Sequence, residues 1–197
     1  GKIIWSQLSP DGRYLLATVS FGSSGASTEL FLDDLSDAEG FQPVVTDIDA
    51  RFLGEFAGDR LILRTNWKAS NWRLLSVPLD SPELDAAEEI VPERDDVVIE
   101  SVTPAAGRLL VKSLRNVVSD VAVYRPDGTH EGGLELEGKV TLGGIDAGWE
   151  RSEVLYSVSS FHRPATVYRH DLESGDRSEW WREPAPIDPD EFVVKQV

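Results

Sequence analysis

The sequence contains no cysteine and is poor in positive charge. Without cysteine there are no disulfides, no thiolate nucleophile, and no zinc or iron–sulfur site built on sulfur ligands. Lys and Arg total 19 against 35 Asp and Glu, so the 197 residues carry a formal net charge of −16. That sign disfavours nonspecific binding to DNA, RNA or anionic lipid. We therefore expect neither a nucleic-acid partner nor a membrane partner.

Long apolar segments are also absent. No run approaches the roughly 20 apolar residues that span a bilayer, and the first five residues lack the layout of a signal peptide. These two absences predict a soluble protein, and we expect it in the cytoplasm.

The sequence has no methionine, the initiator included, and its first residues already form an apolar run. We therefore expect a processed chain or a piece excised from a longer one. With 41% hydrophobic residues, the chain is long enough for one ordinary domain with a core. Intrinsic disorder of the whole chain is excluded.

A turn followed by an apolar strand recurs four times, with the strands beginning at Arg13, Arg60, Arg108 and Glu153. The repeat length is therefore 45 to 48 residues. Each repeat has a strand before its turn (3–8, 51–56, 97–102, 139–145), a second apolar strand after it (29–32, 72–75, 121–124, 166–169) and a plausible last strand (44–48, 87–91, 132–136, 177–181). Four short strands in about 45 residues are typical of a β-propeller blade. The sequence therefore predicts an all-β fold, a β-propeller of about four four-stranded antiparallel blades.

The repeats predict blades at about 1–50, 51–95, 96–138 and 139–183. Residues 184–197 hold three prolines and an acidic cluster, so we expect a linker that leaves the last blade. Helical signals are weak, because Pro92 limits any helix in residues 82–93. Propellers usually have about four to eight blades, so four blades favour an open arc and again indicate a fragment.

Residues that could carry catalysis or bind a metal are few. The run Gly22-Ser23-Ser24-Gly25 departs from the Gly-x-Ser-x-Gly pattern of a nucleophile elbow and is better read as a flexible loop. The three histidines lack metal-ligand spacing, and the acidic pairs lack a calcium-binding pattern. We therefore expect no catalytic residue, no metal site and no cofactor. The six tryptophans can line a carbohydrate or peptide groove, although inter-blade packing explains them better.

Several runs resemble the propeller of the prolyl oligopeptidase family. They are 9–15 (SPDGRYL), 65–74 (TNWKASNWRL), 90–93 with 96–97, 160–172 with its Ser-Phe-x-x-Pro segment, and 194–197. The resemblance covers essentially the whole chain and keeps the motifs in order. The propellers of oligopeptidase B and acylaminoacyl-peptidase share some of these runs and rank second.

This resemblance implies a seven-bladed propeller that caps an α/β-hydrolase domain with a Ser, Asp and His triad. The propeller would restrict access to short peptides, which are cleaved after proline. The chain would correspond to the last four blades, and residues 184–197 would lead toward the hydrolase domain of the same parent chain. The parent would be a serine endopeptidase, whereas this chain lacks the triad and should be inactive alone.

The resemblance also implies three substrate-binding positions. A substrate-contacting arginine and a nearby cysteine of the family fall on Ser20 and Ser23, and a further apolar contact falls on Ile3. Both serines depart from the family residues. Loss of the arginine removes a bidentate donor and changes how a peptide would be held.

The repeat pattern alone supports a second function equally well, a non-catalytic β-propeller scaffold that binds peptides or proteins on a loop face. A Gly-x-Ser-x-Gly serine encoded downstream would favour the peptidase, whereas a stop codon or further blades would favour the scaffold. Carbohydrate binding rests only on the number of tryptophans.

Overall fold

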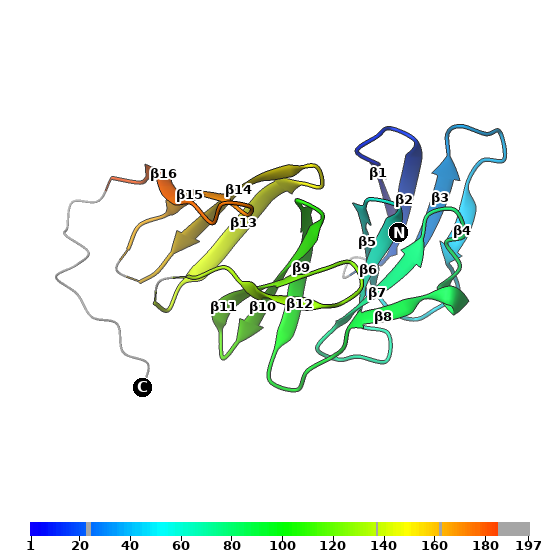
Figure 1. Ribbon diagram of the computed structural model, residues 1–197. Helices are drawn as coiled ribbons and strands as arrows, with labels where there is room; N and C mark the ends of the chain where they lie inside the picture. The colour runs from blue at the N-terminus through cyan, green and yellow to red at the C-terminus, as the bar shows by residue number, and fades with distance from the viewer. Residues whose placement is uncertain (23–24, 137, 162, 185–197) are drawn as a thin grey trace.

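The computed structural model describes all residues except 23–24, 137, 162 and 185–197. In this part of the chain, 16 strands form four separate four-stranded antiparallel sheets (Figure 1). The strands of each sheet lie side by side in the order in which the chain makes them. The predicted all-β propeller architecture is confirmed.

We call the four sheets blades 1 to 4. Blade 1 contains β1 (Lys2–Leu8), β2 (Tyr14–Phe21), β3 (Ser27–Asp34) and β4 (Gln42–Val45), and blade 2 contains β5 (Phe52–Ala57), β6 (Arg60–Thr65), β7 (Arg73–Pro78) and β8 (Glu88–Val91). Blade 3 contains β9 (Val98–Ala105), β10 (Arg108–Arg115), β11 (Val118–Tyr124) and β12 (His130–Gly133), and blade 4 contains β13 (Thr141–Gly148), β14 (Arg151–Ser159), β15 (Thr166–Asp171) and β16 (Arg177–Arg182). Most of the predicted linker lies outside the described residues.

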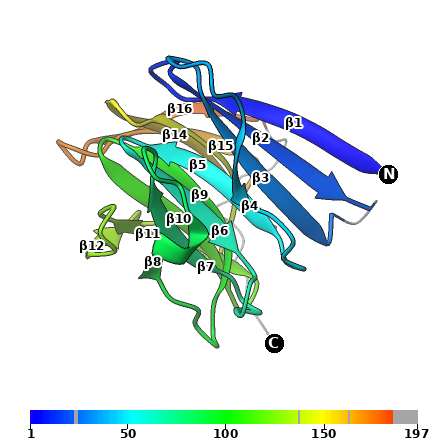
Figure 2. The same ribbon diagram turned by 90° about the vertical axis from the view of Figure 1, so that its right-hand side faces the viewer.

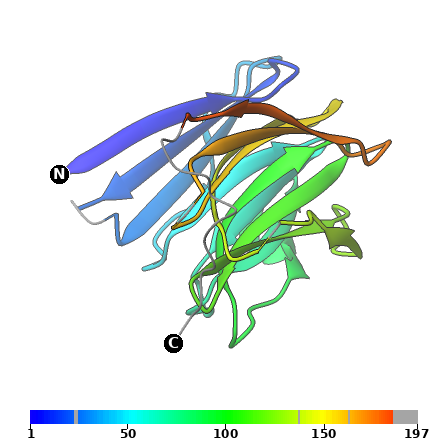
Figure 3. The same ribbon diagram turned by 90° about the vertical axis from the view of Figure 1, so that its left-hand side faces the viewer.

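The blades follow one another in an arc. Blade 1 and blade 4 lie at opposite sides of the view in Figure 1, and Figures 2 and 3 show the arc from its blade 1 side and its blade 4 side. The first strands of neighbouring blades are in contact, β5 with β9 and β9 with β13. These first strands therefore line the inner side of the arc.

A hydrophobic core fills each of the three gaps between neighbouring blades. Strand β6 shows how one apolar run serves two cores: Leu61 and Leu63 pack toward blade 1, and Ile62 between them packs toward blade 3. All three side chains are fully buried. A strand covered on both faces has no polar face to alternate with, which explains its continuously apolar sequence.

Residues 82–93, where a helix was possible, form only a three-residue 3₁₀ turn, η1 (Leu84–Ala86). The following residues pair with β7 as strand β8, which buries Ile90 and Val91 in the core between blades 2 and 3. Sheet pairing and core burial therefore stabilise these residues as a strand, and the helical turn stays three residues long.

Side chains at the start of the third strand join each blade to the next. Thr28 Oγ1 donates to the carbonyl of Phe52 (2.8 Å) and accepts from the Phe52 N–H (2.7 Å). Ser119 Oγ accepts from the N–H of Leu142 (2.9 Å). In blade 2 the equivalent position is Trp72. Thr28, Trp72 and Ser119 each lie two residues before a fully buried residue that faces the next blade. These buried residues are Leu30, Leu74 and Val121.

These contacts fix how the blades are oriented. The start of β3 lies beside the start of β5, the residue before Trp72 bonds Ile99 near the start of β9, and the start of β11 lies beside the start of β13. All first and third strands therefore begin at one end of the arc, which we call the proximal end. Gly22, Gly25 and Ala26, the loop 66–72 and the described residues between blades lie there.

Candidate functional site

The family resemblance implies substrate-binding roles for Ile3, Ser20 and Ser23, and the structure describes the first two. Ile3 and Ser20 are register partners on β1 and β2, so they lie together at the proximal end of blade 1. Ile3 is exposed, whereas Ser20 is buried between its strand neighbours. Ser23 lies outside the described residues. The substrate role of all three stays a prediction.

Arg51 lies near Ser20 in the structure, and nothing in the sequence marked this arginine as a site residue. A side chain placed on Gly25 would meet Ser20 Oγ at 3.0 Å and Arg51 Nη2 at 3.8 Å. Gly25 has a φ of +59° and no side chain, which lets its backbone lie close to Ser20 and Arg51. The Arg51 guanidinium therefore lies close to the position where the family arginine was expected and is absent.

Two asparagines, Asn66 and Asn71, anchor the loop 66–72 beside Arg51. The Oδ1 of Asn66 accepts from the backbone N–H of Arg51 (2.8 Å), which ties the loop to the start of β5. At the other end of the loop, the Asn71 side chain donates to the carbonyl of Arg94 (3.0 Å), and its backbone N–H donates to Glu93 (2.6 Å). These bonds anchor the loop to both neighbouring segments and hold it in place.

Trp72 ends this loop with a φ of +69°, which is uncommon for a bulky residue. Its ring is contacted by two guanidinium groups, with Cζ of Arg64 4.0 Å and Cζ of Arg51 5.8 Å from the ring centre. Arg64 comes from β6 and also donates to the carbonyl of Ile99 (3.3 Å) in blade 3. We call Arg51, Arg64 and Trp72 the arginine–indole cluster.

The cluster is electrostatically unfavourable in its present state. Burial, followed by the charge of Arg51, lowers the pKa of Arg64 to about 10, against the attraction of Glu100 and Glu55. Both carboxylates have other partners: Glu100 pairs with Lys112 (3.0 Å), and Glu55 accepts from Gln7 (3.2 Å). Burial also raises the pKa of Glu55. Two neighbouring, partly desolvated cations favour the approach of a negative group.

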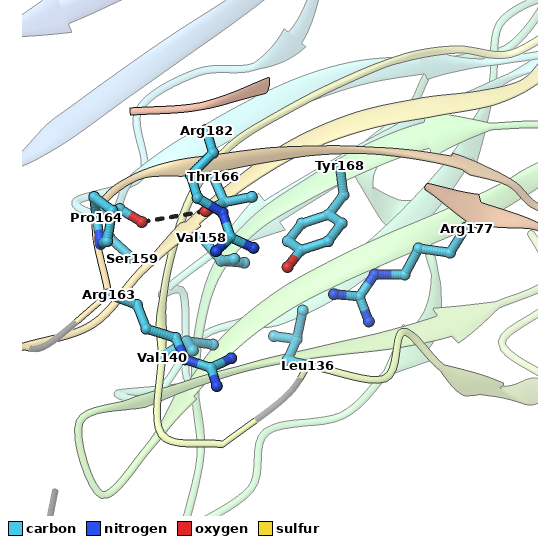
Figure 4. A pocket seen from close by; sticks show the side chains of 10 residues that line it. All are labelled: Leu136, Val140, Val158, Ser159, Arg163, Pro164, Thr166, Tyr168, Arg177 and Arg182. Atoms are coloured by element: carbon cyan, nitrogen blue, oxygen red, sulfur yellow. Dashed lines mark hydrogen bonds between the residues drawn. The ribbon is translucent and has the colours of Figure 1, made fainter. Parts of the chain in front are cut away.

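A small cavity lies where blade 4 meets the segment that precedes it, and Arg163 and Pro164 of the Ser-Phe-x-x-Pro run line part of it. Figure 4 shows Arg163, Arg177 and Arg182 around Tyr168. Arg177 stacks on the Tyr168 ring with Cζ 3.9 Å from its centre, and it donates to the carbonyl of Glu135 (3.3 Å). Arg182 pairs with Glu179. Arg177 therefore links β16 to β15 and to the residues that follow blade 3, and Arg182 forms an ion pair within β16.

The remaining candidate groups have packing or pairing partners. His130 stacks edge-on against Tyr124, and burial lowers the pKa of His170 beside Tyr156. Asp34 of an acidic pair binds Arg13 through both carboxylate oxygens, and these hydrogen bonds hold its pKa well below the usual range. Within the described ranges, no cluster of three histidine or carboxylate ligands suits a metal ion.

The fold defines the class of protein: a run of β-propeller blades in an open arc. Residues 2–183 match a family model described as the N-terminal beta-propeller domain of prolyl oligopeptidase. The chain therefore belongs to the prolyl oligopeptidase family, as its motifs suggested.

Known relatives are several times longer than this chain. The chain is 23% identical over 188 residues to a prolyl endopeptidase of Elizabethkingia miricola, which covers 95% of the chain and 26% of the relative. It is 28% identical over 153 residues to dipeptidyl aminopeptidase BI of Pseudoxanthomonas mexicana, and this match covers 76% of the chain and 21% of the relative. The chain thus spans about a quarter of the relatives it matches.

Solved structures share the fold. A prolyl endopeptidase structure superposes with a TM-score of 0.90 at 23% identity, over 100% of this chain and 28% of that one. Prolyl oligopeptidase B from Galerina marginata superposes with a TM-score of 0.86 at 21% identity, over 100% of this chain and 29% of that one. In the part of the chain that the structure describes, no helix is long and apolar enough to cross a membrane.

Proposed function

We propose that this chain is part of the propeller of a prolyl-oligopeptidase-like serine peptidase, and that it limits which peptides reach a hydrolase domain of the same parent chain. The observation that carries the proposal is the match of residues 2–183 to the propeller domain of this family. We expect this peptidase to act in the cytoplasm and to cleave after proline. Both points stay predictions.

The geometry indicates how such a propeller would act. Packed cores join the blades into a continuous wall, so the wall excludes substrates by their size. The chain enters β1 and leaves β16 at the proximal end, so a domain that follows directly would face the loops there. Ile3, Ser20 and the arginine–indole cluster lie at that same end of the arc.

In this proposal the chemistry belongs to the other domain. A serine there attacks the peptide carbonyl and loses its proton to a histidine, and water then releases the acyl group. The propeller contributes exclusion and positioning, which raise the effective concentration of a correctly held peptide. No step of bond cleavage uses a residue of this chain.

The test compares two substrates of the natural parent protein. We expect it to cleave a short proline-containing chromogenic peptide and to leave the same sequence intact inside a folded protein. The 197-residue chain should cleave neither. Activity of this chain alone that a serine-directed reagent blocks would overturn the proposal, and so would equal cleavage of both substrates by the parent.

A further inference from the structure

We propose that the arginine–indole cluster binds a carboxylate of a peptide at the proximal end, with Arg51 as the principal donor and Arg64 as a second positive charge. The ligand class rests on the proposed function, since it takes the ligand to be a peptide. The anion preference rests on the cluster itself.

Arg51 is the first line of evidence. Its Nε is buried and donates no hydrogen bond to any residue that the structure describes. An unpaired buried donor is costly, and a charged donor more so. In the described part of the chain, no carboxylate lies within 4 Å of the guanidinium nitrogens of Arg51 or Arg64. Because this Nε is buried, a ligand carboxylate would approach the terminal nitrogens of the guanidinium and supply the missing negative charge.

The second line of evidence is the contrast with the rest of the protein. The chain has 35 acidic residues for 19 basic ones, so carboxylates are in excess. Arginines elsewhere use them: Arg13 pairs with Asp34, Arg108 with Glu131, and Arg151 with Asp146. Arg51 and Arg64 differ from these arginines, since neither pairs with a carboxylate of the residues that the structure describes.

The surroundings favour a planar anion. Trp72 backs both guanidiniums with its ring, which restricts their motion and shields them from water. The nearest carboxylates, Glu55 and Glu100, already have Gln7 and Lys112 as partners. A guanidinium presents parallel N–H groups that match the two oxygens of a carboxylate.

The site is open to a ligand. Arg51, Arg64 and Trp72 are each partly exposed, so a ligand can reach the cluster from the surface. Exposed Ile3 lies on the neighbouring strand pair. A peptide that enters from the proximal end therefore meets an apolar side chain and two cations within one region.

The experiment measures binding of three matched peptides to the 197-residue chain at low salt by calorimetry. They are an acetylated Gly-Pro-Phe with a free C-terminal carboxylate, its C-terminal amide, and an amide with one internal glutamate. We expect the free carboxylate to bind at least about tenfold tighter than the plain amide, as charge-assisted hydrogen bonds are stronger. Tight binding of the glutamate peptide would assign the site to acidic side chains as well.

Three variants make the test specific. Arg51→Gln should remove the difference between carboxylate and amide, and Arg51→Lys should leave a smaller difference because it keeps the charge but loses the forked donors. Arg151→Gln is the matched control, since it removes one exposed arginine in blade 4 and should keep the full difference. Thermal unfolding of each variant shows that it is folded.

Equal binding of carboxylate and amide peptides would overturn the anion site, and so would binding of none of the peptides. So would an unchanged preference in folded Arg51→Gln. These results would leave the proposed function standing, because that function fails separately when the parent protein does not distinguish short peptides from folded proteins.

Discussion

Replacing Phe52 with alanine is expected to lower the free energy of unfolding by about 3–5 kcal/mol. The Phe52 side chain is fully buried in the core between blades 1 and 2, and its ring packs against Trp67 at 6.1 Å between centres. Its backbone N–H and carbonyl bond Thr28, and alanine keeps both bonds. The loss therefore reports the cavity that the missing ring leaves between the blades.

Phe41→Ala is the matched control for this variant. Phe41 is 47% exposed in the connection before β4, so the same deletion there should cost less than about 1 kcal/mol. Urea unfolding of both variants gives the comparison. Equal losses would mean that Phe52 is not at a packed joint between blades, contrary to the structure.

Replacing Gly128 with alanine is expected to cost roughly 3–5 kcal/mol, because two penalties combine. Gly128 has a φ of +86° in the turn between β11 and β12. A Cβ there would lie 2.3 Å from the carbonyl oxygen of Ile90 in β8 of blade 2. Alanine would therefore strain the turn and push it away from the neighbouring blade.

Gly12→Ala separates these two penalties. Gly12 ends the same Pro-Asp-Gly sequence between β1 and β2 and has a φ of +76°, but a Cβ there meets nothing within 4 Å. Only the backbone strain remains, so we expect a loss of about 1–2 kcal/mol. A loss at Gly128 no larger than that at Gly12 would show that the contact between the turn and blade 2 is absent.

The sequence predicted the fold because its turns and strands repeat. The Pro-Asp-Gly turn at 10–12 folds as its residues require: Ser9 Oγ donates to Asp11, the Tyr14 N–H donates to Ser9 Oγ, and Gly12 takes the positive φ. Strand limits were less accurate. The last strand of blade 1 was expected at 44–48 but ends at Val45, since Asp47 has a φ of +58° and turns the chain toward blade 2.

The cluster that we propose as a binding site could not be predicted from the sequence. Arg51, Arg64 and Trp72 come from a connection, a second strand and the end of a loop before a third strand, and no local motif joins them. Trp72 was noted as one of the six tryptophans and as part of a run that resembles the family, and neither observation joins it to an arginine. Only packing of the blades brings the three together, and none of the described carboxylates pairs with the guanidiniums, so the signal is in the tertiary structure.

The most direct test of the central claim is the intact mass of the natural protein, together with the peptide sequence that follows Val197. We predict a much longer chain in which a Gly-x-Ser-x-Gly serine and then an aspartate and a histidine follow the blades. A natural chain that ends at Val197 would contradict the peptidase account, and a peptide-binding scaffold would then be the better description.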